Sequence, residues 1–251
     1  MMRHNKVHIY GTHAVMEALV HAPGVVSKVM LTQGTHDPRL LEAIRKAGLP
    51  VQRISSGQKA RDISGSEANQ GVIGVLLVDK LVRNYDDFMR TLKPGPDTSL
   101  ALLGEIKDPH NVGAIIRSAA AFGVSGILMP RHKQAPVTGT VVKVSAGMAF
   151  RVPIVELGNV NTAVRDLKDR GFHIYGLAAE GRTTVHNEQF TEPSVFILGS
   201  EGEGIRAKTT QLCDTLLSIP IHPRCESLNV AASSAVAFFA WSRQHPRAIS
   251  A

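Results

Sequence analysis

Apolar, strand-like runs alternate with helical patterns along most of the chain, and this alternation restricts the fold more than any other feature. In the second half, such runs occur at 100–103, 126–129, 153–156, 173–177, 195–198 and 215–221, with helical segments between them. Strands that alternate with helices form mostly parallel sheets covered by helices on both faces. These sheets bind ligands at the C-terminal ends of their strands. The sequence therefore predicts an α/β fold with a site at that edge.

The first 80 residues form a smaller α/β pattern of their own. Strands and helices are expected at 8–10, 12–21, 27–31, 38–47, 51–54 and 71–78. After residue 79 the pattern weakens, and Lys93–Ser99 has the Pro, Gly and polar content of a surface connector. We therefore expect two domains, 1–79 and 100–251, joined by a linker at 80–99.

The charge of the chain favours an anionic partner. The formal net charge is +7, and residues 1–80 hold ten Lys or Arg against six Asp or Glu. Clustered basic side chains gain affinity for polyanions because they release counterions from phosphates. Charge alone does not identify the polyanion.

The cysteine content and the hydropathy exclude several classes of protein. With only Cys213 and Cys225, neither a disulfide framework nor a four-cysteine zinc site can form. His222 could add a third ligand, but the spacing is unlike that of zinc sites, so no metal is expected. No apolar run reaches the roughly 18 residues of a membrane helix, and no leader opens the chain. We expect a cytoplasmic protein without a membrane partner.

A first segment of interest, Asp108–Gly123, directly follows a buried strand. Asn111 is a natural N-cap for a helix expected over 111–122. Arg117 lies on that helix among apolar and small residues. It either extends to solvent from an ordinary amphipathic helix or serves a site at the end of the strand.

A second segment, Val195–Ile205, runs from a buried strand into a turn with glycines at 199, 202 and 204 and Glu201 at the strand tip. Glycines allow a ligand to approach the backbone closely, although a plain tight turn needs them equally. The spacing does not match the dinucleotide fingerprint, and no G-K-[ST] is present. A dinucleotide-dependent oxidoreductase is therefore disfavoured and a Walker loop is excluded.

A third segment, Ile219–Trp241, begins with a proline-containing loop and continues as a long apolar helix. Ser227 and Asn229 stand at the start of this helix, and either could cap it. Two such side chains, in addition to the glycines and carboxylate of the second segment, are more than a cap needs.

In order and spacing, the three segments resemble the motifs of the SpoU/TrmH-type RNA 2′-O-ribose methyltransferases. The matching positions are Asp108, Pro109, Asn111, Gly113, Arg117, Phe122, Gly123, Gly199, Glu201, Gly202, Gly204, Ile205, Ile219, Pro220, Ser227, Leu228, Asn229 and Val230. Residues 140–147 also look like the helix that the family places between the first two motifs. The third motif departs from the usual pattern at Ile221, Pro223 and Ala231–Ala232, which we interpret as tuning because Ser227 and Asn229 are intact.

The resemblance implies a parallel α/β domain with a deep trefoil knot, S-adenosylmethionine as the cofactor, and a homodimer formed through the C-terminal domain. The cofactor would be held largely by backbone groups at Leu198, Gly199, Ile219 and Leu228. The catalytic residues implied are Asn111, Arg117, Glu201, Ser227 and Asn229.

The role of Arg117 is open at this point. In related enzymes the matching arginine is proposed as a general base, yet a guanidinium has a pKa above about 12 and stays protonated in proteins. We expect Arg117 to remain cationic, to hold the adjacent phosphate and to stabilise the developing alkoxide. The other four residues would orient Arg117 and the nucleoside.

Residues 9–19 look like the start of the RNA-binding domain of the RlmB-like branch, a small α/β fold similar to certain ribosomal proteins. The resemblance implies a guanosine of large-subunit ribosomal RNA as the substrate. A transfer-RNA 2′-O-methyltransferase is one alternative. Another is an inactive, ribosome-associated RNA-binding protein, which predicts loss of Arg117, Glu201 and Asn229, all of which are present.

Overall fold

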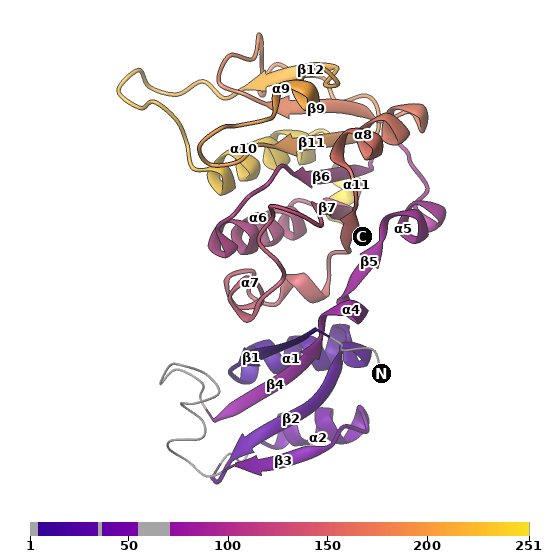
Figure 1. Cartoon of the computed structure of the whole chain (residues 1–251), viewed down its shortest axis with the longest axis vertical. Coiled ribbons are helices and arrows are strands. Elements are labelled where there is room, and N and C mark those ends of the chain that lie inside the picture. The colour runs from indigo at the N-terminus through magenta and orange to yellow at the C-terminus, as the bar shows by residue number, and fades with distance from the viewer. Residues whose placement is uncertain (1–4, 35–36, 55–70, 251) are drawn as a thin grey trace. The chain divides into compact units, whose positions relative to one another are not determined.

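The computed structural model describes residues 5–34, 37–54 and 71–250. Contacts divide the chain into two compact units (Figure 1). Unit 1 comprises residues 1–82 and 137–151, and unit 2 comprises residues 83–136 and 152–251. The domain limits expected from the sequence stay a prediction.

Unit 1 is built on a four-stranded mixed sheet in the order β1-β4-β2-β3. Strand β4 pairs antiparallel with β1 and β2, whereas β2 and β3 are parallel. Each strand and helix predicted before residue 80 is present. The elements are β1 (Lys6–Tyr10), α1 (Thr12–His21), η1 (Pro23–Val25), β2 (Val26–Thr32), α2 (Pro38–Lys46), β3 (Val51–Ile54), β4 (Val72–Leu77) and α4 (Val78–Leu81).

The segment 137–151 contributes α7 (Gly139–Val144) and η2 (Met148–Phe150) to unit 1. The guanidinium of Arg151 donates to both carboxylate oxygens of Glu17 on α1, over 2.9 and 3.0 Å. A Cβ at Gly139 would lie 2.3 Å from the carbonyl oxygen of His8. Glycine at 139 therefore permits the close approach of α7 to β1.

Unit 2 is built on an eight-stranded sheet in the order β10-β12-β9-β11-β6-β7-β8-β5. The pairings from β10 to β8 are parallel, as predicted. The elements are β5 (Val82–Asn84), α5 (Tyr85–Thr91), β6 (Ser99–Leu103), α6 (Pro109–Ala121), β7 (Gly126–Pro130), β8 (Ile154–Leu157), α8 (Val160–Asp169), β9 (His173–Leu177), β10 (Thr183–Thr184), β11 (Ser194–Leu198), α9 (Ala207–Thr210), β12 (Thr215–Ser218), α10 (Val230–Ser242) and α11 (Pro246–Ile249). Strand β12 ends earlier than predicted, because Pro220 cannot donate to a ladder.

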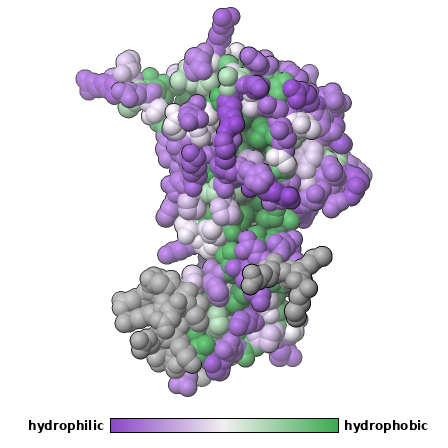
Figure 2. All heavy atoms as spheres, viewed as in Figure 1, coloured by the Kyte–Doolittle hydropathy of each residue, from purple (hydrophilic) through white to green (hydrophobic). Residues whose placement is uncertain are grey.

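Helices cover both faces of this sheet, and side chains alternate between them along each strand. Val195 and Ile197 of β11 share an apolar cluster with Leu167 of α8 and with residues of α5. Between them, Phe196 points to the other face, where its ring packs edge-on against Phe238 of α10 at a centroid distance of 5.8 Å. Helix α10 also packs against α6 on that face. The visible surface of unit 2 is largely hydrophilic (Figure 2).

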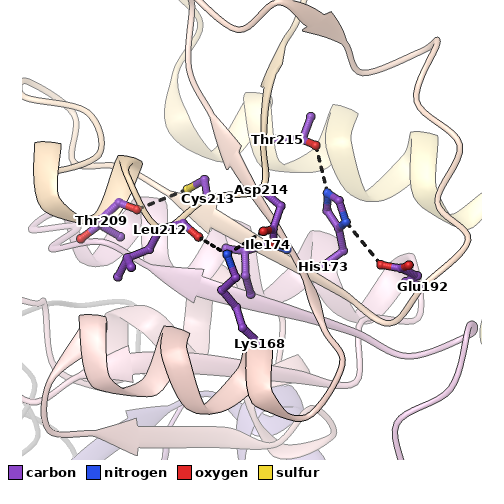
Figure 3. A network of polar contacts seen from close by, with 9 residues as sticks. All are labelled: Lys168, His173, Ile174, Glu192, Thr209, Leu212, Cys213, Asp214 and Thr215. Carbon is purple, nitrogen blue, oxygen red and sulfur yellow. Dashed lines mark hydrogen bonds and ion pairs between the residues drawn. The ribbon is translucent and has the colours of Figure 1, made fainter.

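A polar network joins α8, β9 and the start of β12 (Figure 3). Asp214 accepts hydrogen bonds from Lys168 Nζ over 2.6 Å and from the Ile174 amide over 2.9 Å. Nearby, His173 contacts Thr215 Oγ1 at 2.9 Å and Glu192 at 3.4 Å. These contacts position the neighbouring strands β9 and β12, whose C-terminal ends lie at the edge where the site is expected. Within the described residues, no helix has the length and apolar composition needed to span a membrane.

Gly123 closes α6 with a φ of +73°, and a Cβ there would lie 2.3 Å from the Ala248 carbonyl oxygen. We expect Gly123→Ala to destabilise unit 2 by about 2–4 kcal/mol, because the positive φ and the steric clash both oppose a side chain. The matched control is Gly171→Ala, where φ is +84° but nothing lies within 4 Å. It should cost only about 1–2 kcal/mol. The fluorescence of Trp241, the single, buried tryptophan, reports both thermal transitions; equal shifts would contradict the prediction.

Candidate active site

Helix α6 begins two residues before the predicted start, and this corrects the expected role of Asn111. Asp108 is the N-cap, its carboxylate accepts from the His110 amide over 2.8 Å, and Pro109 takes the first helical position. Proline suits that position because its missing N–H would have no partner there. Asn111 is therefore not the cap, and its side chain is available for other contacts.

Asn111 links two segments that are far away in sequence. Its Nδ2 donates to Glu201 Oε1 over 3.0 Å, and its Oδ1 accepts from Asn229 Nδ2 over 3.0 Å. Asn229 also caps α10 through a 2.8 Å bond from the Ala231 amide to its Oδ1. A cap uses only the side-chain oxygen, so the amide nitrogen of Asn229 can bind Asn111. The structure thus brings one predicted site residue from each of the three segments into one hydrogen-bonded chain.

Glu201 is held as a carboxylate at the tip of the loop after β11. Burial by itself would raise its pKa, but hydrogen bonds from Asn111 and from the backbone amides of residues 201, 107 and 108 hold that pKa below its usual value. The bond from the Lys107 amide to Oε2 is 3.5 Å long. Glu201 is therefore ionised at neutral pH and cannot serve as a general acid there.

The loop after β11 needs glycine for its own folding. Ser200 and Gly204 exchange backbone hydrogen bonds of 3.0 and 3.1 Å, which folds the loop back over Gly199. A Cβ at Gly199 would lie 2.2 Å from the Gly204 carbonyl carbon. A side chain at 199 would therefore disrupt the loop itself, which makes this position a poor probe of cofactor binding.

Arg117 and Ser227 are not part of the hydrogen-bonded chain. Both side chains are exposed, and neither makes a hydrogen bond or ion pair within the described residues. Arg117 lies on α6, between one and two turns after Asn111. Ser227 lies in the loop that precedes the Asn229 cap. Their grouping with the other three residues stays a prediction.

The four residues predicted to hold the cofactor all lie at the C-terminal edge of the sheet. Leu198 ends β11 and its carbonyl accepts from the Gly104 amide over 2.6 Å. Ile219 directly follows β12 and is half-buried, and Leu228 is 40 % exposed in the loop before α10. An exposed leucine beside Asn229 is suited to the wall of a ligand site. Their role in cofactor binding stays a prediction.

A second group of residues at the C-terminal edge of the sheet was not predicted from the sequence. These residues directly follow β6, β7 and β8 and line a cavity of about 250 Å³. None of the predicted site residues lines this cavity. The only available sequence signal was two short polar stretches, residues 131–134 and 158–161, that directly follow strands.

The cysteines behave as structural or surface groups. Burial raises the pKa of the Cys213 thiol to about 11, and its Sγ donates to the Thr209 carbonyl over 3.5 Å. Cys225 is exposed in the loop before α10. Among the residues that the structure describes, no group of three or more His, Cys, Asp and Glu side chains is arranged to hold a metal.

The lowered pKa of Glu201 predicts how its contribution to stability varies with pH. The ionised form is favoured by the fold, so the contribution is present above the ordinary carboxylate pKa of 4.5 and is lost as the pH falls through the lower, folded value. The difference in melting temperature between wild type and Glu201→Gln should therefore be smaller below pH 4.5 than at neutral pH. A difference that grows on acidification would contradict this assignment.

Two family profiles match separate parts of the chain. The profile of the SpoU rRNA Methylase family matches residues 99–239, and that of the RNA 2′-O ribose methyltransferase substrate binding family matches residues 8–76. The 23S rRNA (guanosine-2′-O-)-methyltransferase RlmB of Xanthomonas campestris pv. campestris is 35% identical over 94% of this chain and 96% of its own length. RlmB of Haemophilus ducreyi is 33% identical over 94% of this chain and 97% of its own.

Solved structures match the fold of the chain as well. The crystal structure of the SpoU methyltransferase AviRb from Streptomyces viridochromogenes, in complex with AdoMet, superposes with a TM-score of 0.79 at 24% identity. It covers 96% of this chain and 91% of the other. Both family profiles and the full-length relatives lead to one conclusion: the chain belongs to the SpoU family of RNA 2′-O-ribose methyltransferases.

Proposed function

We propose that the protein transfers a methyl group from S-adenosylmethionine to the ribose 2′-hydroxyl of a guanosine in large-subunit ribosomal RNA. The observation that carries the proposal is the hydrogen-bonded chain from Glu201 through Asn111 to Asn229, which joins all three motif segments. The RlmB relatives support guanosine and ribosomal RNA, because they match over nearly their full length. This favours ribosomal over transfer RNA.

The chemistry assigns a distinct task to each group. When bound, S-adenosylmethionine supplies an electrophilic methyl group, and the ribose oxygen must be aligned with it and lose its proton. We assign Arg117 to the phosphate and to the developing negative charge on that oxygen, because a guanidinium is a persistent cation. Asn111, Glu201, Ser227 and Asn229 orient the nucleoside and the loops.

Leu198, Gly199, Ile219 and Leu228 are proposed to hold the cofactor. Strands β9, β11 and β12 are neighbours and run parallel, so the loops after β11 and β12 emerge at the same edge. Adenine and a methionine chain need a shaped, mainly apolar pocket with a few directed hydrogen bonds. Three aliphatic side chains beside a glycine loop fit that requirement. The family also implies that these loops form a trefoil knot.

A homodimer is proposed to form through the face of α10 that points away from the sheet. Val236 and Phe239 on this helix are 38 % and 51 % exposed, and the Phe239 ring packs on Phe122, the residue directly after α6, at a centroid distance of 5.7 Å. Exposed aromatic and aliphatic side chains on adjacent helices are typical of a protein interface. Residues 1–79 are proposed to bind RNA, residues 80–99 to form the linker, and residues 100–251 to form the catalytic domain, in a cytoplasmic enzyme.

Mapping of 2′-O-methylated nucleotides by mass spectrometry, in cells with and without this protein, tests the proposal. We expect a single guanosine of 23S ribosomal RNA to lose its methyl group in the deletion strain and to regain it on complementation. An unchanged ribosomal map together with a lost transfer-RNA methylation would overturn the substrate. No change in either RNA would favour the inactive RNA-binding alternative.

A further inference from the structure

A cavity of about 250 Å³ lies at the C-terminal edge of the unit 2 sheet, and no residue proposed above for catalysis or the cofactor lines it. Its walls come from the loops after four adjacent strands, β11, β6, β7 and β8. The strand order reverses at this place, since the chain proceeds from β6 to β7 and β8 on one side, whereas β9 and β11 lie on the other. Parallel α/β sheets bind ligands in the crevice at such a switch point.

The lining combines an apolar surface with amides and cations. The half-buried Val160 and Ile205 contribute the apolar part, and Lys133 and Arg206 contribute exposed cations. This combination suits an aromatic heterocycle attached to a phosphate, because an apolar wall packs on the ring and the cations neutralise the anion.

Two amides at the start of α8, those of Asn159 and Asn161, also face the cavity. The Oδ1 of Asn161 accepts from the Thr209 hydroxyl over 2.8 Å, which fixes the orientation of the half-buried amide. Within the described ranges its Nδ2 has no hydrogen-bond partner. A fixed amide with an available donor is a suitable reader of the edge of a base.

The backbone around the cavity is strained at two places. Glu105 and Lys133 have φ values of +65° and +59°, and in the described part of the chain only one other non-glycine residue, Ala146, has a positive φ. Such conformations are unfavourable for residues with a side chain and concentrate at functional sites. Glu105 uses its position to bind Arg206 Nη2 over 2.7 Å. The strained backbone therefore places Lys133 at the cavity and, through Glu105, orients Arg206.

A neighbouring cavity of about 500 Å³ extends this site toward the hydrogen-bonded chain. It shares Glu105, Lys133 and Arg206 with the first cavity and is also lined by Lys107. The Lys107 amide donates to Glu201, so the second cavity adjoins the proposed reactive site. An extended ligand could occupy both.

We propose that the first cavity binds a nucleotide of the substrate RNA that lies next to the methylated one in the strand. Its base would pack on Val160 and Ile205 and be read by Asn161, and its phosphate would lie beside Lys133 and Arg206. At about 250 Å³ the cavity is slightly below the roughly 300–1,000 Å³ of most small-molecule sites, so it has room for no more than one nucleotide. Proteins read RNA mainly through such unstacked, single-stranded bases. The inference rests on the proposed function.

Asn161→Asp is the sharpest test, because it keeps the acceptor for Thr209 but replaces the donor with a negatively charged oxygen, which can neither donate to a base nor favour a nearby phosphate. With an unmodified 23S rRNA transcript, we expect KM and the filter-binding Kd for RNA to rise about tenfold, the loss of a base contact. The calorimetric Kd of S-adenosylmethionine should not change. The control is Asn187→Asp, which adds the same charge at an exposed turn outside the cavity. Unchanged RNA binding, or weaker cofactor binding instead, would overturn the inference.

Lys133→Gly provides a second test that does not depend on the stability of the first variant. Glycine tolerates a positive φ, so the fold should be as stable as wild type or more so. The affinity for RNA should nevertheless fall several-fold, and its dependence on salt should weaken by about one ion. An unchanged salt dependence would contradict the assignment of Lys133 to a phosphate. The activity of wild type tests the proposed function separately, since a wild type that methylates no RNA refutes that function whatever the variants bind.

Discussion

Arg117→Ala is expected to reduce the rate of methyl transfer by roughly 10²–10³-fold, the usual cost of removing one group that stabilises charge in a transition state. The melting temperature should not change, because the side chain is exposed and has no polar partner within the described residues. The matched control is Arg247→Ala, an exposed arginine on α11 whose side chain lines neither cavity and has no polar partner within the described residues. It should retain full activity.

Arg117→Lys distinguishes the two roles that this arginine could have. A cation that holds a phosphate and the developing alkoxide can be replaced in part by lysine, so we expect intermediate activity that does not rise with pH. A general base would behave differently, because lysine loses its proton near pH 10 and should become active there. The single-turnover rate of the lysine variant, measured between about pH 7 and about pH 10, distinguishes the electrostatic role from the general-base role. Strong recovery at high pH would refute the electrostatic role.

The regular part of the fold could be predicted because its signals are local. Each predicted strand in both units is present, since buried strands read as continuous apolar runs between turn residues. Strands β5 and β10, with only three and two residues, carry no such signal. Helix α5 was also missed, although Asn84 caps it through the Asp86 and Asp87 amides. A cap before a helix of only seven residues, four of them polar, is too weak a signal to recognise alone.

For the site, the sequence could predict which residues take part but not the contacts between them. The three motifs identify Asn111, Glu201 and Asn229, but the bonds between them join residues 90 and 118 positions apart. Contacts of that kind depend on the strand order, which a single sequence does not specify. The same limit explains why the sequence favours Asn111 as a cap and does not indicate Asn161. Asn111 and Asn161 each lie two or three residues after the residue that caps their helix. The role of such a side chain is ambiguous until its neighbours in space are known.

Reversing the polarity of the hydrogen bond between Asn111 and Glu201 should distinguish a structural role of Asn111 from direct contact with the nucleoside. Asn111→Asp places a second carboxylate against Glu201 Oε1, at a position where an amide now donates over 3.0 Å. Repulsion between two like charges at this distance should lower both the melting temperature and the activity, the latter by about 100-fold or more. Adding Glu201→Gln restores a donor–acceptor pair with its polarity reversed. The aspartate at 111 would still accept from Asn229 Nδ2, as Asn111 Oδ1 does now.

We therefore expect the double variant to be more stable than Asn111→Asp alone, with a coupling of about 1–3 kcal/mol measured by thermal unfolding. Its methylation rate should equal that of Glu201→Gln, because both variants lack the carboxylate at 201 and keep the loop anchored to α6. If stability recovers but the rate stays below that of Glu201→Gln, Asn111 itself contacts the nucleoside through its amide. If stability does not recover, the bond between Asn111 and Glu201 does not hold the loop after β11, and the proposed assembly of the site is wrong.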